Sequence, residues 1–218
     1  MPLVNLKKVA DAIERAKKEA KPRRFKQSVE LIVKLRDVDI RIPENRINEI
    51  VTLPCPPQDK LSKVCVIGKG DLILKAKEAG ADLVLEREDI EKYGANRRAL
   101  RKLAKAYDFF IAEADLMPLI GRYFGPILGP RGKMPIPIPP TADPKPLIER
   151  LRRSIRIRIR NQPQVMCRVG VEDMNSMDIA KNVDAVFTVL ARKYRVPQNI
   201  EKVYVKLTMG PAVPVDPW

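Results

Sequence analysis

Hydrophobic residues recur with two different periods along the chain. Near each end, apolar residues at helical spacing predict an amphipathic helix, and alternation of apolar and polar residues predicts amphipathic strands. The predicted helices cover residues 5–20 and 177–194, the second with Ser176 placed to cap it. The predicted strands cover residues 28–35, 50–53 and 202–208.

Residues 155–160 read Ile-Arg-Ile-Arg-Ile-Arg. Side chains alternate between the two faces of a strand, so one face of this strand is apolar and the other carries a row of arginines. A sheet with one apolar and one cationic face suits a polyanionic partner, although a solvated face or arginines paired with carboxylates explain the row as well.

The middle of the chain has a different pattern of hydrophobic and polar residues. Continuous apolar strands alternate with short helices, which predicts a parallel α/β sheet. The predicted strands are 63–68, 82–85 and 108–112, and the predicted helices are 71–79, 95–106, 115–123 and 146–153. Residues 125–146 are dense in glycine and proline and are predicted to form an ordered, stiff loop.

These two hydrophobic patterns predict two domains. Amphipathic elements at both ends indicate a discontinuous α+β outer domain over residues 1–65 plus 155–218. The α/β elements indicate an inserted domain over residues 66–154. The ends are more basic per residue than the middle, so the main binding surface is expected there.

Charge defines the kind of partner. The chain of 218 residues carries a formal net charge of +15, which favours nucleic acid over a membrane surface. Aromatic residues are only 5%, so binding should depend on phosphate and sugar contacts and on shape. The sequence has no apolar run that could span a bilayer and no signal-peptide pattern, and we expect a cytoplasmic protein.

Several chemistries are excluded by composition. The chain has no histidine, which removes Ser-His-Asp and Cys-His catalysis. Its cysteines, Cys55, Cys65 and Cys167, form no Cys-x-x-Cys pair and indicate buried thiols in a reducing compartment. We therefore expect no zinc site and no catalysis that depends on histidine.

One turn invites a nucleotide-binding interpretation. Gly68-Lys69-Gly70 follows a predicted strand and opens a predicted helix, but Ile73 stands where a third glycine of the dinucleotide fingerprint belongs. A tight structural turn is the favoured interpretation, and a nucleotide-dependent α/β enzyme remains the alternative from another functional class.

Three further motifs suit RNA. Residues 24–30 combine cations, an aromatic ring, a hydroxyl and a carboxylate; Phe25 either contacts RNA or packs the helix against the sheet. Residues 129–133 form a cationic turn, interpreted first as a rigid connection and second as an accessory RNA contact. Residues 208–211, Thr-Met-Gly-Pro, either admit a close RNA backbone or form an ordinary turn.

Together these segments resemble the ribosomal protein L-one family, the universal stalk protein of the large subunit. The resemblance covers nearly the whole chain and rests on residues 24–30, 127–135 and 208–211 together, with 69–70 and 78–82 in support. The prolines of residues 135–140 look like the archaeal branch.

The resemblance implies an inserted Rossmann-like, three-layer α/β domain without a nucleotide, and an outer domain that binds RNA. Family positions that bind RNA map onto Phe25, Lys26, Ser28, Glu30, Arg160, Asn161, Gln162, Thr208, Met209 and Gly210. Arg24 is a further RNA-binding candidate from its own segment, and Arg131 and Lys133 of the cationic turn are accessory candidates. The resemblance also implies no enzymatic activity, no metal and no cofactor. The implied partners are large-subunit ribosomal RNA, exit-site tRNA whose release it assists, and the protein's own mRNA, whose translation it represses. The free protein is expected to be a monomer.

Two expectations can be tested directly. Gly210→Val should block the approach of RNA while leaving the fold intact. Structured ribosomal RNA should compete better than duplex DNA, because a general basic nucleic-acid-binding protein would not distinguish 2′-hydroxyls and irregular loops.

Overall fold

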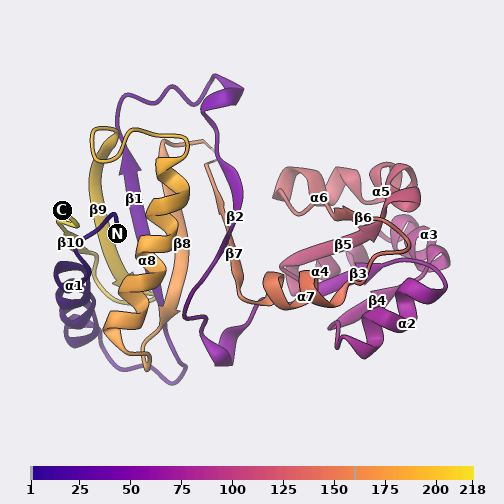
Figure 1. The fold of residues 1–218 in the computed structure, drawn as a ribbon, viewed down its shortest axis with the longest axis horizontal. Coiled ribbons are helices and arrows are strands. Elements are labelled where there is room, and N and C mark those ends of the chain that lie inside the picture. Colours follow the sequence, from indigo (N-terminus) through magenta and orange to yellow (C-terminus); the bar gives the residue numbers. More distant parts are fainter. Residues whose placement is uncertain (1, 160) are drawn as a thin grey trace. The chain divides into compact units, whose positions relative to one another are not determined.

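The computed structural model describes residues 2–159 and 161–218 (Figure 1). The chain divides into two compact units. The outer unit contains the residues up to Lys60 and Ser154–Trp218, and the inserted unit contains Leu61–Arg153. The boundary predicted between residues 65 and 66 falls inside a buried strand, Val64–Ile67, and is therefore corrected to Leu61.

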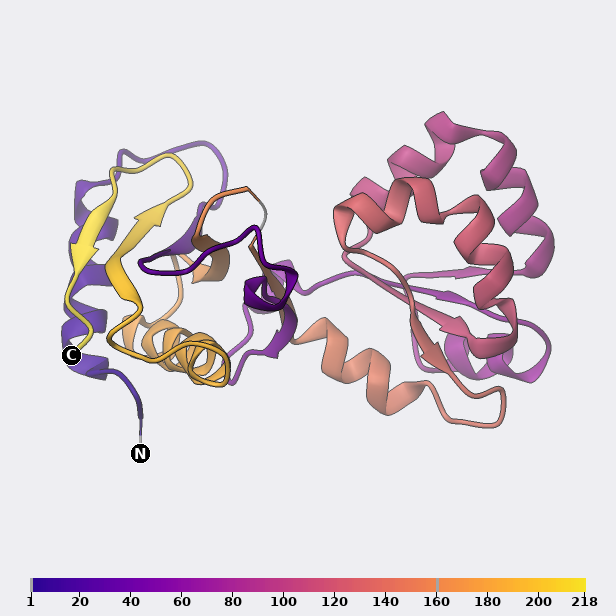
Figure 2. The same ribbon diagram turned by 90° about the horizontal axis from the view of Figure 1, so that it is seen from above.

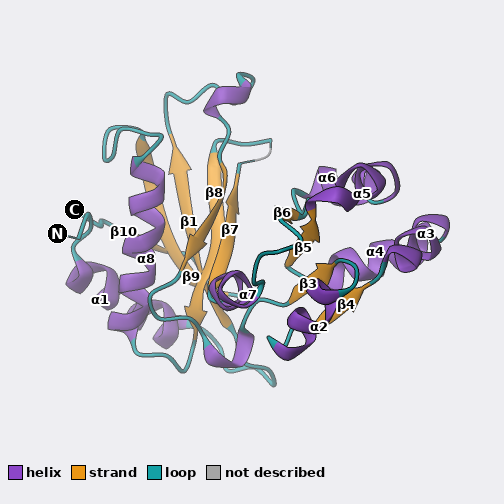
Figure 3. Cartoon of the chain, turned by 45° about the vertical axis from the view of Figure 1, so that its right-hand side comes forward, coloured by secondary structure: helices purple, strands orange, loops and turns teal. Residues whose placement is uncertain are grey.

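The outer unit contains two antiparallel sheets and two long helices (Figure 3). One sheet has the order β10-β9-β1-β8, and the other pairs β2 with β7. The elements are α1 (Leu6–Glu19), β1 (Ser28–Leu35), β2 (Asn48–Thr52), β7 (Ser154–Arg158), β8 (Gln164–Val171), α8 (Ser176–Ala191), β9 (Ile200–Leu207) and β10 (Val213–Val215).

Alternate side chains of the larger sheet build the core of the outer unit. Val29, Leu31, Val33 and Leu35 of β1 are fully buried, as the alternation in the sequence predicted. They lie in one hydrophobic cluster with residues of α1 and α8, such as Ile13. The helices thus cover one face of this sheet, and the side chains between the buried ones lie on the other face.

The inserted unit has a parallel sheet of order β4-β3-β5-β6 flanked by helices (Figure 2). Every residue of β3 and β5 is buried, so both faces of these strands are covered. The elements are β3 (Val64–Ile67), α2 (Asp71–Glu78), β4 (Leu83–Leu85), α3 (Arg87–Ala95), α4 (Arg97–Ala106), β5 (Phe109–Glu113), α5 (Met117–Tyr123), α6 (Gly125–Arg131), β6 (Ile136–Ile138) and α7 (Lys145–Arg152).

The predicted stiff loop over residues 125–146 is wrong. This segment contains helix α6 and strand β6. Pro126 lies in the first turn of α6, where a missing N–H costs nothing, and Gly132 ends the helix in the left-handed conformation with φ +68°. Pro126 and Gly132 thus mark the two ends of a helix rather than turns of an ordered loop.

Other elements also differ from the prediction. Strands β8 and β10 and helix α3 were not predicted. Helix α8 begins at Ser176 and is capped by Asn175, whose Oδ1 accepts a hydrogen bond from the backbone N–H of Met177 at 2.9 Å. Ser176 is buried and its hydroxyl donates to Glu14 instead. Within the described residues, none of the helices combines the length and the apolar composition that crossing a bilayer requires.

Candidate RNA-binding surface

The larger sheet of the outer unit has one face that neither α1 nor α8 covers, which we call the open face. Its side chains are those that alternate with the core residues on β1, β8 and β9. They are Ser28, Glu30, Ile32, Lys34, Gln164, Met166, Arg168, Lys202, Tyr204 and Lys206.

Strand register arranges these side chains in rows across three strands. The rows are Lys206–Glu30–Arg168, Tyr204–Ile32–Met166 and Lys202–Lys34–Gln164. The middle row is apolar, and Met166 is 59% exposed. Cations lie in the rows on either side of it, where Lys34 pairs with Glu201 at 2.8 Å and Lys206 lies 3.8 Å from Glu30. The open face thus combines cations, which phosphates would share with these carboxylates, with an apolar band suited to sugars and bases.

At one end of the open face, segments far apart in sequence are tied together. The N–H of Ser28 donates to Oγ1 of Thr208 at 3.1 Å, and the N–H of Thr208 donates to the carbonyl of Ser28 at 3.0 Å. The hydroxyl of Ser28 accepts from Nζ of Lys60 at 3.2 Å. Both predicted hydroxyl residues therefore lie together and also have structural contacts.

Gln27 connects the segments at this end, and its role was not predicted from the sequence. Its side chain is 1% exposed. Its Oε1 accepts from the N–H of Met209 at 3.0 Å, and its Nε2 donates to the carbonyl of Lys21 at 3.2 Å. The signal in the sequence was a polar residue at a position that the strand alternation assigns to the interior. Gln27 fixes the turn that carries Met209, which is 56% exposed.

Phe25 does not pack the helix against the sheet. It is 51% exposed and is absent from the hydrophobic cluster of the outer unit. Arg24 beside it is exposed as well. An aromatic ring and a guanidinium on a short loop before β1 are therefore accessible to a partner.

Lys26 lies between two carboxylates. Its Nζ forms ion pairs with Asp59 and, at 2.7 Å, with Asp173. Hydrogen bonds to Asp173 and Asp59 raise the pKa of Lys26, and the bond from Lys26 lowers the pKa of Asp59 below its usual range. A phosphate must therefore compete with both carboxylates for this ammonium group.

Gly210 lies close to two apolar side chains of the outer unit. A Cβ at this position would lie 3.1 Å from Cβ of Ala20 and 3.3 Å from Cβ of Leu207. A side chain at position 210 would therefore press on Ala20 as well as on an approaching RNA, and the expected effect of Gly210→Val on RNA binding stays a prediction. Variants at Met209 and Phe25 probe this end better because both side chains are exposed.

Asn161 and Gln162 lie at the opposite end of the sheet from Ser28. Pairing of Lys34 with Gln164 and of Ser28 with Val171 fixes this direction, and the ends of β1 are about 20 Å apart. The structure therefore separates these two predicted residues from the group around Thr208. Arg160 lies outside the described residues.

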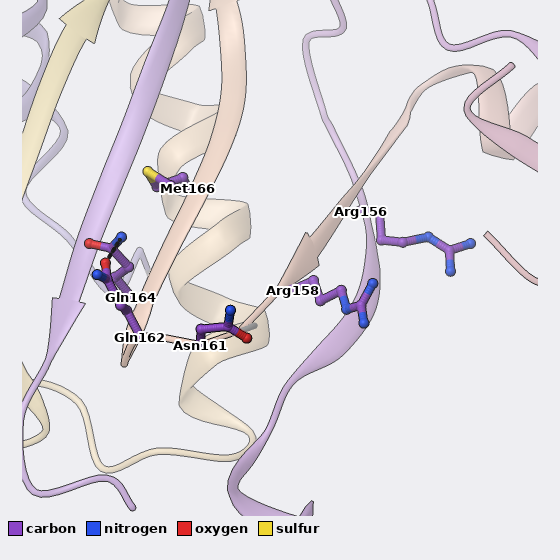
Figure 4. A pocket seen from close by; sticks show the side chains of 6 residues that line it. All are labelled: Arg156, Arg158, Asn161, Gln162, Gln164 and Met166. Atoms are coloured by element: carbon purple, nitrogen blue, oxygen red, sulfur yellow. Dashed lines mark hydrogen bonds between the residues drawn. The ribbon is translucent and has the colours of Figure 1, made fainter. Parts of the chain in front are cut away.

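A groove of about 450 Å³ surrounds Asn161 and Gln162 (Figure 4). Arg156 and Arg158 project from the same side of β7, while Gln164 and Met166 come from β8. Partial burial, with repulsion from Arg158, lowers the pKa of Arg156. Two of the arginines in the Ile-Arg repeat thus line a groove with amide groups and a thioether.

Arg131 and Lys133 belong to the inserted unit. Nζ of Lys133 donates to the carbonyls of Ala104 at 3.0 Å and Tyr107 at 2.6 Å, which caps the end of α4. Nη1 of Arg131 donates to the carbonyl of Ile127 at 3.4 Å. Local contacts account for both side chains, and their accessory contact with RNA stays a prediction.

The Gly68-Lys69-Gly70 turn does not suit a phosphate. The N–H of Lys69 donates to Oε2 of the fully buried Glu113 at 3.0 Å. Its ammonium lies 3.4 Å from both Glu113 and Asp115. Carboxylates at the end of β5 repel phosphate at the place where a nucleotide would bind.

Among the residues that the structure describes, no group of His, Cys, Asp or Glu side chains could hold a metal ion.

Fold and surface thus define a basic α/β protein with a discontinuous outer unit. A sequence profile of the ribosomal protein L1p/L10e family matches residues 5–211. The match covers most of the chain, and the chain belongs to this family. It is a ribosomal protein rather than an enzyme.

Individual relatives agree with this assignment. The chain is 54% identical to the large ribosomal subunit protein uL1 of Thermofilum pendens, over 94% of this chain and 93% of the relative. It is 50% identical to uL1 of Pyrobaculum arsenaticum, over 98% of this chain and 95% of the relative. It is 45% identical to uL1 of Methanothermobacter thermautotrophicus over 95% and 98%. These archaeal relatives confirm the resemblance to the archaeal branch.

Proposed function

We propose that the protein is a component of the large ribosomal subunit and binds its ribosomal RNA through the open face. The observation that carries this proposal is the set of cross-strand rows, in which cations flank the apolar band of Tyr204, Ile32 and Met166. The family assignment makes ribosomal RNA the partner to test first.

Each part of the surface has a distinct task in this proposal. The lysines and Arg168 on the open face neutralise phosphates, which gives affinity that falls with salt. Phe25 and Met209, both more than half exposed, pack on sugars or unstacked bases. Asn161 and Gln162 in the groove form hydrogen bonds to base edges or 2′-hydroxyls, with Arg156 and Arg158 on the adjacent phosphates.

Finer roles follow from the family resemblance and remain proposals. The protein assists release of tRNA from the exit site and represses translation of its own mRNA by offering that mRNA the same surface. It works in the cytoplasm and is a monomer when free. Addition of the protein's own mRNA leader should compete with ribosomal RNA if the two bind the same surface.

The main experiment compares two pairs of substitutions in the full-length protein. Phe25→Ala with Met209→Ala should lower affinity for purified large-subunit ribosomal RNA by tenfold or more, because each base–aromatic contact contributes about 1–3 kcal/mol. Leu74→Ala with Met177→Ala removes exposed apolar side chains from α2 and α8 and serves as the control. Equal affinities for the two pairs would contradict the site.

A competition experiment separates this function from general nucleic-acid binding. Structured ribosomal RNA should displace a bound RNA fragment at a much lower concentration than duplex DNA of equal length. Equal competition by DNA would favour a general basic protein, because DNA lacks 2′-hydroxyls and irregular loops.

A further inference from the structure

Helix α4 of the inserted unit, which is labelled in Figure 3, carries several exposed cations. Its sequence, RRALRKLAKA, contains no acidic residue. Its other face is apolar and packs into the core of the inserted unit through Leu100, Leu103 and Ala104. The exposed cations are Arg97, Arg98, Arg101, Lys102 and Lys105.

This charge pattern is unfavourable for the protein alone. Arg97, Arg101 and Lys105 follow one another at a spacing of four residues, where like charges repel. Arg97 and Arg98 also lie in the first turn, where the helix dipole disfavours cations. An anionic partner relieves both effects.

The cations of α4 have no carboxylate partners in the described part of the chain. On neighbouring helices the charges are balanced: Lys75 pairs with Asp71 on α2, and Lys92 lies close to Glu88 and Asp89 on α3. None of the five exposed cations of α4 forms an ion pair within residues 2–159 and 161–218. At the C-terminal end of α4, Lys133 donates to the carbonyls of Ala104 and Tyr107 and lies 3.8 Å from Asp108.

We propose that the cationic face of α4 is a second RNA-binding surface, which holds a phosphate backbone. Successive cations at i and i+4 lie about 6 Å apart, so flexible side chains reach neighbouring phosphates. The exposed face between Arg97 and Lys105 spans about 12 Å, which suits a short stretch of one strand. It gives no base-reading groups and therefore binds without sequence preference.

Other partners fit the face less well. A membrane-surface helix needs an exposed apolar side, but the apolar side of α4 is buried in the core. A protein interface is typically built on exposed aromatic, methionine or other apolar anchors, and the exposed face of α4 has only small alanines between its cations. RNA matches the charge and is the polymer that a ribosomal protein meets.

The test compares two charge-matched triple variants of the full-length protein. Arg97→Gln, Arg101→Gln and Lys105→Gln neutralise one row of α4, while Lys75→Gln, Lys77→Gln and Lys92→Gln neutralise as many cations on α2 and α3. The α4 variant should reduce the slope of log affinity against log salt by about 2–3 for purified large-subunit ribosomal RNA. The control should change it by less than one. Equal changes overturn the proposal.

A footprint distinguishes this surface from the open face, because the inference rests on the proposed ribosomal RNA partner. Hydroxyl-radical cleavage of the bound RNA should lose one protected segment in the α4 variant and a different one in the Phe25→Ala, Met209→Ala variant. If only the α4 variant loses protection, RNA binding at the open face is contradicted and RNA binding at α4 is supported. An α4 variant with the wild-type footprint and slope but poor assembly into subunits would indicate a protein partner and overturn the proposal.

Discussion

The two units present side chains to a partner in different ways. The antiparallel sheet of the outer unit is covered on one face, so every second residue of β1, β8 and β9 lies on the other face. The parallel strands β3 and β5 are buried on both faces. In the described part of the inserted unit, these two strands therefore offer no side chain to a partner, whereas the outer sides of helices such as α4 do.

This difference explains where specificity can arise. A sheet face holds side chains from three strands at fixed distances, which suits recognition of a shape. A single helix face presents one row of flexible cations, which suits attraction to any phosphate backbone. The outer unit is therefore expected to select the RNA, and the inserted unit to add affinity without selection.

The largest loss of stability should come from core substitutions that destabilise one unit at a time. Phe110→Ala removes a buried ring from the inserted core and should cost that unit about 3–5 kcal/mol, because it leaves a cavity. Phe187→Ala should do the same in the outer core. Calorimetry measures the loss of stability in each variant, and RNA-binding assays measure the accompanying change in affinity.

Only the second substitution should reduce binding to the open face. If Phe110→Ala reduces protection of every RNA segment as much as Phe187→Ala does, the two units do not act separately. Loss of protection at one segment alone agrees with the contribution proposed for α4.

A smaller effect is expected from Gln27→Ala. This change leaves the N–H of Met209 and the carbonyl of Lys21 without their partner, which costs about 1–3 kcal/mol. Urea unfolding measures the loss, and RNA affinity should fall with it because the Met209 turn is no longer held. Gln58→Ala, at an exposed position, is the control and should leave both quantities unchanged.

Asp59→Asn should strengthen RNA binding. The substitution removes one of two carboxylates that compete with phosphate for Lys26, so affinity at low salt should rise several-fold. Asp216→Asn, which removes the exposed partner of Lys8, is the matched control. An unchanged affinity in the Asp59 variant would mean that Lys26 does not contact phosphate.

The same pair predicts a small effect of pH on stability. The pKa of Asp59 is lowered in the folded state by its bond from Lys26, so the pair stabilises the protein above the unfolded pKa of about 3.9. This contribution is lost as pH falls through the lower, folded pKa. Thermal unfolding between pH 6 and pH 2 should show a shallower decline for Asp59→Asn than for the wild type.

The smallest expected effect concerns the rates at which a thiol reagent modifies one buried cysteine in each unit. Burial raises the pKa of Cys65 in the inserted unit and raises that of Cys167 in the outer unit to about 12. Both should resist a thiol reagent at pH 8 until their unit opens. Phe110→Ala should accelerate modification of Cys65 and leave Cys167 unchanged; equal acceleration would indicate one cooperative unit.

Elements with a clear period were predictable from the sequence. The alternation in residues 28–35 predicted β1, and the continuous apolar run at 63–68 predicted β3. Segment 125–146 was not, because proline and glycine mark helix ends as well as loops. Strand β8 was missed because its outward Gln164, Met166 and Arg168 have no common character until their face is known.

The site was predictable only in part. The resemblance identified Phe25, Ser28, Thr208 and Met209, and the structure brings them to one end of the sheet. Register between strands placed Gln162 at the other end, which no single segment of sequence reveals. Gln27 was missed because its role depends on contacts across residues that are distant in the chain.

The pairing of β1 has a consequence for synthesis of the chain. Strand β1 lies between β8 and β9, and the N–H of Asn5 donates to the carbonyl of Pro217 at 2.7 Å. A nascent chain thus carries the first strand of its outer sheet unpaired while the inserted unit, Leu61–Arg153, emerges and folds from contiguous residues. The open face forms only after Leu207 has emerged. Incomplete chains therefore lack the surface proposed to select RNA and are not expected to occupy its binding site.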